Sequence, residues 1–312
     1  MSNLAFVFPG QGSQSVGMAK ELAETFTEVK QLFEQASDVL GKNLWKLVSE
    51  GPEAELNQTY NTQPALLVTE VALWQSWCKQ TALRPSFLAG HSLGEYTALV
   101  CANVLSLSDG VKLVAERGRL MQEAVPAGVG AMAAILGLED AVVDDICNQV
   151  SSQEVVSAVN FNAPGQVVIA GHSNAVDQAI DAAKSAGAKR AIKLPVSVPS
   201  HCILMKPAAD QLAAYIQNIP FATPEITLIH NVDVQHHQDV SEIKTALVQQ
   251  LHQPVRWVDT IKYIAAQGVT HFVECGPGKV LMGLNKRIAK EAEHLTFYNP
   301  ETLNDVREKL NG

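Results

Sequence analysis

The segment Gly90-His-Ser92-Leu-Gly94 constrains the fold of this chain more than any other short stretch of its sequence. An apolar run, Ser86-Phe-Leu-Ala89, leads into it, and a helical stretch from Glu95 to Ala102 follows. The sequence therefore predicts a strand that turns sharply into a helix with a serine exposed at the turn, which is the context of a nucleophilic serine. Ser92-x-x-Glu95 also fits a capping box, in which the serine only caps the helix, and the local pattern leaves both interpretations open.

Strand-like and helical stretches alternate in the first third of the chain and again after residue 200. The expected strands cover residues 4–8, 86–89 and 271–275, and the expected helices cover about residues 16–40, 65–80, 95–102, 111–125, 203–217 and 241–251. Such alternation favours a mainly parallel sheet with helices on its faces, so the predicted fold class is α/β.

The middle of the chain shows a different order of elements. Strands are expected at residues 131–136, 155–160, 166–170 and 190–194, with helices at 139–150 and 175–186. The order βαββαβ is that of a ferredoxin-like unit. We therefore expect a small ferredoxin-like subdomain over residues 128–195, inserted into a large α/β subdomain formed by residues 1–127 and 196–312.

A second segment, Gly171-His-Ser173-Asn-Ala175, also follows a strand and begins a helix. It has alanine where the second glycine of the turn should stand, and it falls within the predicted ferredoxin-like unit. We interpret Ser173 as a helix N-cap, which leaves Ser92 as the better candidate for a nucleophile.

A serine nucleophile requires a base, and His201 is the best placed of the nine histidines. It follows the strand-like residues Pro195 to Val198 and precedes the helix at 203–217, whose dipole would disfavour a charged imidazolium. A histidine in this place can also simply cap the helix, so both interpretations stay open. His91 fits the packing of the turn, and His236-His237-Gln-Asp239 fits a solvated polar turn better than a metal site.

Composition and the remaining glycine-rich motifs disfavour several classes of protein. A net charge of −9 at pH 7 argues against binding to nucleic acid or to an anionic membrane. Five scattered cysteines without a C-x-x-C pair indicate neither a zinc site nor a disulfide framework, and they favour the cytoplasm. Gly10-x-Gly12 lacks the third glycine of a dinucleotide fingerprint, and Gly276-Pro-Gly-Lys279 lacks the P-loop spacing. We find neither a signal peptide nor an apolar run of membrane-spanning length.

Six motifs together resemble the bacterial malonyl-CoA:acyl-carrier-protein transacylases of type II fatty-acid synthesis, nearly from end to end. They are FPGQGSQ at 8–14, GHSLGEY at 90–96, the helix that carries Arg117, SVPSHC at 197–202, QLHQPVRW at 250–257 and ECGPGK at 274–279. No single motif is specific, but their order and spacing together are. The resemblance implies an α/β-hydrolase-like large subdomain with a ferredoxin-like small one.

The resemblance also implies a role for particular residues. They are Ser92 as the acylated nucleophile, His201 as its general base, Gln250 holding His201 through its backbone carbonyl, the N–H groups of Gln11 and Leu93 as the oxyanion hole, and Arg117 as the ligand of the malonyl carboxylate. The choice of Gln250 over Gln249 depends on the alignment of the Leu251…Pro254-Val255…Trp257 pattern that follows. The implied reaction is a ping-pong transfer from malonyl-CoA to acyl carrier protein, with no metal or other cofactor.

The helical pattern supports Arg117 independently, although an ordinary surface arginine remains the alternative. The apolar stripe of its helix consists of Val111, Val114, Gly118, Met121 and Val125. At about 100° per residue, Arg117 lies closer to this stripe than Arg119 does. An arginine fork suits a carboxylate in a site shielded from water.

Two other functions fit the same turn. A thioesterase would pass the acyl group to water, and a noncatalytic carrier-protein or CoA-binding subunit would use Ser92 only as a cap. For the transacylase we expect a monomer whose acidic carrier protein docks on a local basic cluster. The two clusters available are Lys189-Arg190 with Lys193 and Lys286-Arg287 with Lys290, and both can also be ordinary solvated faces.

Overall fold

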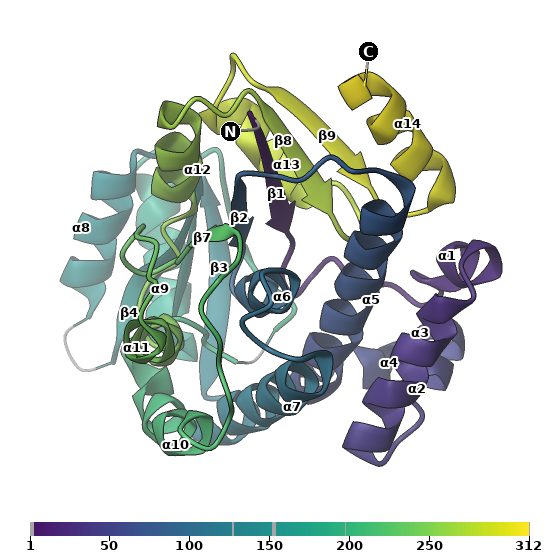
Figure 1. The fold of residues 1–312 in the computed structure, drawn as a ribbon. Coiled ribbons are helices and arrows are strands. Elements are labelled where there is room, and N and C mark those ends of the chain that lie inside the picture. The colour runs from purple at the N-terminus through teal and green to yellow at the C-terminus, as the bar shows by residue number, and fades with distance from the viewer. Residues whose placement is uncertain (1–2, 127, 152–153, 197, 312) are drawn as a thin grey trace.

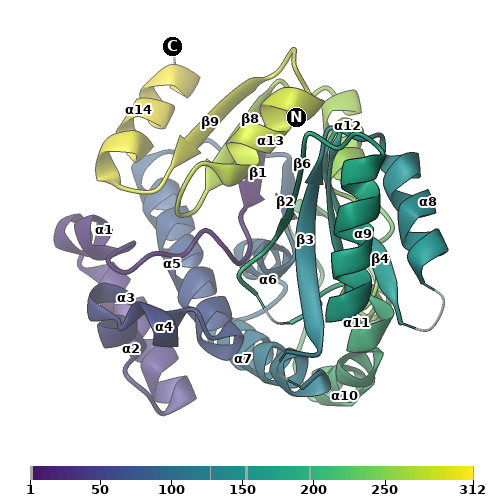
Figure 2. The same ribbon diagram turned by 180° about the vertical axis from the view of Figure 1, so that it is seen from behind.

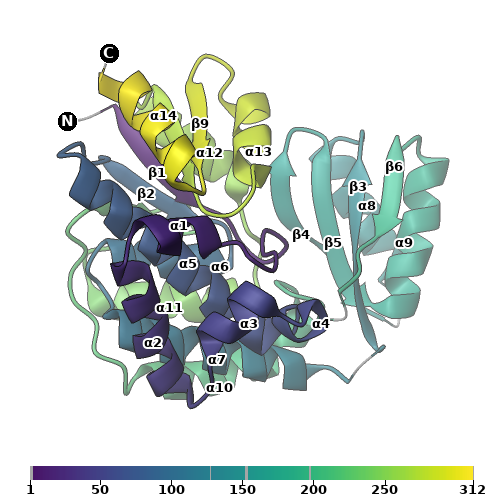
Figure 3. The same ribbon diagram turned by 90° about the vertical axis from the view of Figure 1, so that its right-hand side faces the viewer.

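Two separate β-sheets, one parallel and one antiparallel, organise the computed structural model, which describes residues 3–126, 128–151, 154–196 and 198–311 (Figure 1). The view in Figure 3 places the two sheets next to each other, with helices packed around both. This mixed α/β architecture agrees with the fold class that the sequence predicts.

The parallel sheet has five strands among the described residues, and β1 lies at its centre. Their order is β7 (Thr227–Ile229), β2 (Phe87–Gly90), β1 (Leu4–Phe8), β8 (His271–Cys275) and β9 (Glu293–Phe297). Every residue of β1 is buried and apolar, as expected for a parallel strand that is covered on both faces. Phe6 and Phe8 pack into one core cluster with Trp74 and Trp77, whereas Ala5 and Val7 pack into another.

Helices cover both faces of this sheet. Further helices pack on those that cover the sheet. Together they are α1 (Lys20–Thr25), α2 (Glu28–Leu40), α3 (Leu44–Glu50), α4 (Glu53–Leu56), α5 (Thr59–Gln80), α6 (Leu93–Cys101), α7 (Leu107–Ala124), α10 (Lys206–Ile216), α11 (Val240–Gln250), α12 (Trp257–Ala266), α13 (Val280–Ile288) and α14 (Pro300–Asn311). α5 is buried along most of its length, which suits its position between β1 and α7. No helix of the described residues is long and apolar enough to span a membrane.

The antiparallel sheet and its two helices come from the middle of the chain. They are β3 (Gly130–Leu136), α8 (Asp140–Val150), β4 (Val156–Ala163), β5 (Gln166–His172), α9 (Ser173–Ser185) and β6 (Arg190–Lys193). The strand order is β4-β5-β3-β6. Both helices pack on one face, seen from outside in Figure 2, while Met132 and Val168 on the other face contact Cys202 of the remaining chain.

Several local predictions need correction. The helix expected over residues 16–40 is interrupted between α1 and α2, because Phe26 adopts an extended conformation. The described residues of the strand expected at 195–198 form no strand, and Ser197 of that segment and of the SVPSHC motif lies outside the described residues, as does residue 127 at the predicted subdomain boundary. Ser173 is the first residue of α9 rather than its N-cap, and its hydroxyl accepts a hydrogen bond from Lys193 (2.9 Å).

Candidate active site

The turn at Ser92 has the strained backbone of a nucleophile elbow. Ser92 joins β2 to α6 with φ 53° and ψ −104°, a backbone conformation that residues other than glycine rarely adopt. A Cβ at Gly90 would lie 1.8 Å from the carbonyl carbon of Gly94, and one at Gly94 would lie 2.0 Å from the Phe8 oxygen. Both glycines are therefore required by close packing. The capping box does not form, since the Ser92 side chain accepts no bond from the helix backbone and is free to react.

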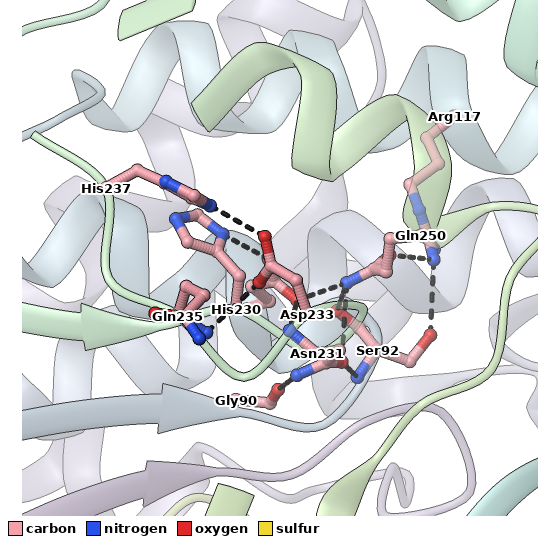
Figure 4. A network of polar contacts seen from close by, with 10 residues as sticks. Gly90, Ser92, Arg117, His230, Asn231, Asp233, Gln235, His237 and Gln250 are labelled. Carbon is pink, nitrogen blue, oxygen red and sulfur yellow. Dashed lines mark hydrogen bonds and ion pairs between the residues drawn. The ribbon is translucent and has the colours of Figure 1, made fainter. Parts of the chain in front are cut away.

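Asn231, which follows β7, holds this turn in place. Its Oδ1 accepts a hydrogen bond from the Ser92 backbone N–H (2.8 Å), and its Nδ2 donates to the Gly90 carbonyl (2.7 Å) (Figure 4). Asn231 could not be predicted from the sequence, because a single asparagine after a three-residue strand carries no pattern. The contact stabilises a backbone conformation that the chain would otherwise avoid.

His201 lies against Ser92, as the family resemblance implies. Its Nε2 is 2.8 Å from Ser92 Oγ, and its Nδ1 is 2.6 Å from the backbone oxygen of Gln250. A carbonyl can only accept, so Nδ1 carries the proton and Nε2 is left to accept from the serine hydroxyl. This arrangement places beside the serine a ring nitrogen that is able to act as a base, on an imidazole oriented by a backbone carbonyl instead of a carboxylate.

The environment of His201 differs from the sequence-based explanation. The residue does not sit at the start of an α-helix, because a short 3₁₀ turn (Ile203–Met205) precedes α10. Burial, and secondarily the positive charge of Arg117, lower the pKa of His201 to about 3. The imidazole is consequently neutral at physiological pH, as a general base requires, but for a different reason than a helix dipole.

Arg117 reaches the same serine from α7. The residue is only 1% exposed, and its two terminal nitrogens donate to Gln63 Oε1 (2.8 Å), Gln250 Oε1 (2.9 Å) and Ser92 Oγ (3.2 Å). Its guanidinium lies over the Tyr96 ring, 5.1 Å from the centroid. Within the described ranges no carboxylate forms an ion pair with it, so a buried positive charge faces the serine without an anionic partner.

Arg119, the alternative on the same helix, is a surface residue. Its side chain is 46% exposed and forms ion pairs with Glu116 and Glu123. The helical pattern therefore separated the buried arginine from the exposed one correctly.

Gln11 and Leu93 line the cavity in front of Ser92, together with His201 and Arg117. The cavity has a volume of about 510 Å³. Apolar side chains also line it, among them Met132, Val168 and Leu284. For neither Gln11 nor Leu93 does the backbone N–H have an acceptor in the part of the chain that the structure describes. Two N–H groups near the serine are thus available to a ligand.

Two further histidines, His91 and His237, have structural contacts. His91 packs against Trp257 with its ring and bonds Asn162 Oδ1 through Nε2 (2.8 Å). His237 pairs with Asp233 and Glu242, and Asp239 caps α11. No group of three or more metal-binding side chains occurs among the residues described.

Comparison with known proteins agrees with this geometry. The chain is 54% identical to the malonyl CoA-acyl carrier protein transacylase of Salmonella typhimurium, with 97% of this chain and 98% of the relative covered, and 53% identical to that of Haemophilus influenzae, with 99% and 100% covered. A crystal structure of an acyl carrier protein S-malonyltransferase from Vibrio cholerae superposes with a TM-score of 0.96 at 55% identity, covering 98% of this chain and 100% of that one.

A further solved structure contains a malonyl-transacylase in complex with a type II polyketide acyl carrier protein. It matches with a TM-score of 0.97 and 52% identity, covering 99% of this chain and 100% of that chain. The model of the acyl transferase domain family matches residues 5–300. Because this family model matches most of the chain and the relatives match nearly all of it, the chain belongs to the acyl transferase domain family.

Proposed function

We propose that this chain transfers the malonyl group of malonyl-CoA to the phosphopantetheine thiol of an acyl carrier protein through a malonyl ester on Ser92. The observation that carries the proposal is that one hydroxyl, Ser92 Oγ, lies 2.8 Å from a neutral base and 3.2 Å from a buried cation without an anionic partner. A base activates the serine, and the cation suits an acyl group that ends in a carboxylate. The names of the near full-length relatives support this substrate.

The proposed reaction has two half-reactions that use the same groups. Ser92 Oγ attacks the thioester carbonyl and gives its proton to His201 Nε2, while the N–H groups of Gln11 and Leu93 bind the oxyanion. The intermediate collapses to the malonyl ester, and the CoA sulfur leaves with the proton from His201. The carrier-protein thiol then loses its proton to His201 and attacks the ester, which restores the Ser92 hydroxyl. The Gln250 carbonyl keeps the imidazole in the required tautomer.

Intact-mass measurement after mixing with malonyl-CoA tests this proposal against its two rivals. A stable adduct of malonyl mass that is discharged by holo acyl carrier protein is the expected result. A transient adduct with release of free malonate would instead identify a thioesterase. Absence of any adduct in the folded protein would leave only the noncatalytic binding subunit.

Arg117→Ala should reverse the preference for malonyl over acetyl groups. The malonyl carboxylate completes a charge-assisted pair in a buried site, whereas acetyl leaves the cation unpaired. Loss of the cation should lower kcat/KM for malonyl-CoA by about 10²-fold, roughly 2.7 kcal/mol, while acetyl transfer holds or rises. Arg117→Lys should recover part of the malonyl activity, because an ammonium lacks the planar fork.

Competition between malonyl-CoA and acetyl-CoA, measured on the wild type and both variants, checks this expectation. Arg119→Ala is the matched control, since it removes an exposed arginine from the same helix. A malonyl-to-acetyl ratio in Arg117→Ala within about threefold of wild type, less than 1 kcal/mol, would show that another group selects the substrate.

The acidic carrier protein should dock on exposed basic residues, since the chain itself has a net charge of −9. Lys193 is already paired with Asp177, and Arg287 donates to Gln166 and to the Pro164 carbonyl. Arg190 and Lys290 are exposed members of the two basic clusters, and neither forms an ion pair or a side-chain hydrogen bond with any residue that the structure describes. Arg190→Glu or Lys290→Glu should therefore raise KM for the carrier protein several-fold without changing KM for malonyl-CoA.

Added salt should raise the same KM in the wild type, because exposed charges are screened. Steady-state kinetics with each substrate varied in turn make the measurement. Unchanged carrier kinetics in both variants would exclude these clusters as the docking surface.

We also propose that the chain is divided into two subdomains. We assign residues 1–127 and 196–312 to an α/β-hydrolase-like catalytic subdomain and residues 128–195 to a ferredoxin-like one. The strand order β4-β5-β3-β6 supports the ferredoxin-like assignment. If the four strands of the βαββαβ unit are numbered along the chain, their order in the sheet is 2-3-1-4. We further propose a cytoplasmic monomer that needs no metal or other cofactor, in keeping with five free cysteines.

A further inference from the structure

A buried carboxylate, Glu95, lies directly behind the active site and has no part in the chemistry proposed above. It comes from the first turn of α6 and is completely buried. Its Oε1 accepts from His230 Nδ1 (2.7 Å), and its Oε2 accepts from Gln250 Nε2 (2.8 Å) and from the Asn231 backbone N–H (3.1 Å). Because burial of a carboxylate is costly, such a residue calls for an explanation beyond packing.

The contact with Gln250 fixes the orientation of an amide that also touches Arg117. Gln250 Nε2 donates to Glu95 and to the Ser92 carbonyl (2.9 Å), so Gln250 Oε1 is the atom that faces the guanidinium (2.9 Å). A flipped amide would place its oxygen against two acceptors and its NH₂ against a donor. Glu95 can only accept when ionised, and it therefore selects one of the two amide orientations.

The neutral amide of Gln250 thus lies between the Glu95 carboxylate and the Arg117 guanidinium. The two acceptors that hold the guanidinium, Gln63 Oε1 and Gln250 Oε1, are uncharged. Arg117 thus keeps the capacity to pair with an incoming carboxylate. Burial lowers the pKa of Arg117, and the nearby Tyr96 and Glu95 offset part of that shift. A carboxylate in direct contact with Arg117 would compete with the substrate instead.

We propose that Glu95 is a positioning residue for substrate selection, which orients the Gln250 amide so that Arg117 is held at Ser92 without an anionic partner. The proposal rests on the proposed function, since it assumes that Arg117 binds the malonyl carboxylate. The proposal separates two tasks of Gln250. Its backbone carbonyl orients His201, and its side chain connects Glu95 with Arg117. Figure 4 shows the contact between the Gln250 side chain and Arg117.

Glu95→Gln tests the proposal, because the new amide has nearly the same shape but cannot accept from all three donors. Single-turnover acylation of Ser92 by malonyl-CoA and by acetyl-CoA, read by intact mass, gives the two rates separately. We expect the malonyl rate to fall about 10- to 100-fold and the acetyl rate to stay within about threefold of wild type. General damage to the site would slow both reactions alike and would overturn the proposal.

Glu70→Gln is the matched control. Glu70 is also completely buried and bonds Thr97 of the same helix α6 (2.5 Å), but it has no contact with Gln250. This substitution should leave the malonyl-to-acetyl ratio unchanged, with thermal unfolding measured for both variants. An equal fall of the ratio in Glu70→Gln would mean that any buried carboxyl group in this region has the same effect.

Gln250→Met covers the case in which Glu95→Gln does not fold. It removes the amide between Glu95 and Arg117 while the backbone carbonyl that holds His201 remains. The proposal requires a lowered malonyl-to-acetyl ratio here as well, and an unchanged ratio would overturn it. Failure of the wild type to form a malonyl adduct would contradict the proposed function itself, whereas a normal wild-type adduct with unchanged ratios in the variants contradicts only the role of Glu95.

Discussion

Replacement of Ser92 by alanine should abolish the malonyl adduct and reduce transfer to the background rate, with the fold intact. The physical reason is that the hydroxyl is the nucleophile that takes the malonyl group from CoA in the proposed reaction, and it lies between His201 Nε2 and the Arg117 fork. Alanine keeps the Cβ that the elbow already accommodates, so the strained turn should persist. Intact-mass analysis after incubation with malonyl-CoA, together with thermal unfolding, makes the measurement.

Ser173→Ala provides the matched control for that experiment. Ser173 stands in the similar segment Gly171-His-Ser173-Asn-Ala175, yet its hydroxyl is bonded to Lys193 on the surface of the antiparallel sheet. Labelling should be nearly unchanged in this variant. Loss of the label in Ser173→Ala alone, with normal labelling of Ser92→Ala, would make the assignment of the nucleophile wrong.

His201→Ala should slow acylation by roughly 10² to 10⁴-fold, the usual contribution of a positioned general base. The imidazole is 3% exposed and bonded on both nitrogens, so no water molecule is expected to take its role with similar efficiency. Pre-steady-state acylation rates of the variant and the wild type give the factor. A loss of less than about tenfold at neutral pH would mean that another residue accepts the proton.

The pH profile of the wild type is a second measurement of the same role. Burial and the charge of Arg117 lower the pKa of His201 to about 3, so the neutral ring persists far below the usual histidine range. The base is lost only when the ring is protonated, and kcat/KM should accordingly stay level from pH 8 down to about pH 5. A fall with a midpoint near 6.5 would contradict this explanation of the base.

The sequence was most informative where a motif combines local geometry with chemistry. The elbow at Gly90 to Gly94 and the stripe that includes Gly118 predicted where Ser92 and Arg117 would lie, because both depend on residues close in the chain. The order βαββαβ was visible for the same reason. Five of the expected site residues line one cavity, and Gln250 contacts two of them, His201 and Arg117, while the catalytic roles stay predictions.

The contacts that position these residues could not be predicted from local patterns. Asn231 bonds the elbow across 139 residues of sequence, and Glu95 bonds His230 across 135. A lone asparagine or glutamate has no periodicity that would reveal such a partner. The short strand β7, which directly precedes His230 and Asn231, was missed because three residues are too few for alternation to be recognised.

The long sequence separations within the site have a consequence for synthesis of the protein. Ser92 meets His201 from 109 residues away, and Gln250 donates to the Ser92 carbonyl across 158 residues. A growing chain that already contains the elbow therefore has neither its base nor the carbonyl that orients this base. Since chains emerge from the N-terminus, the proposed reactivity toward a thioester can arise only after synthesis has passed Gln250. On the proposed mechanism, a malonyl adduct on Ser92 therefore reports that the chain has folded at least as far as Gln250.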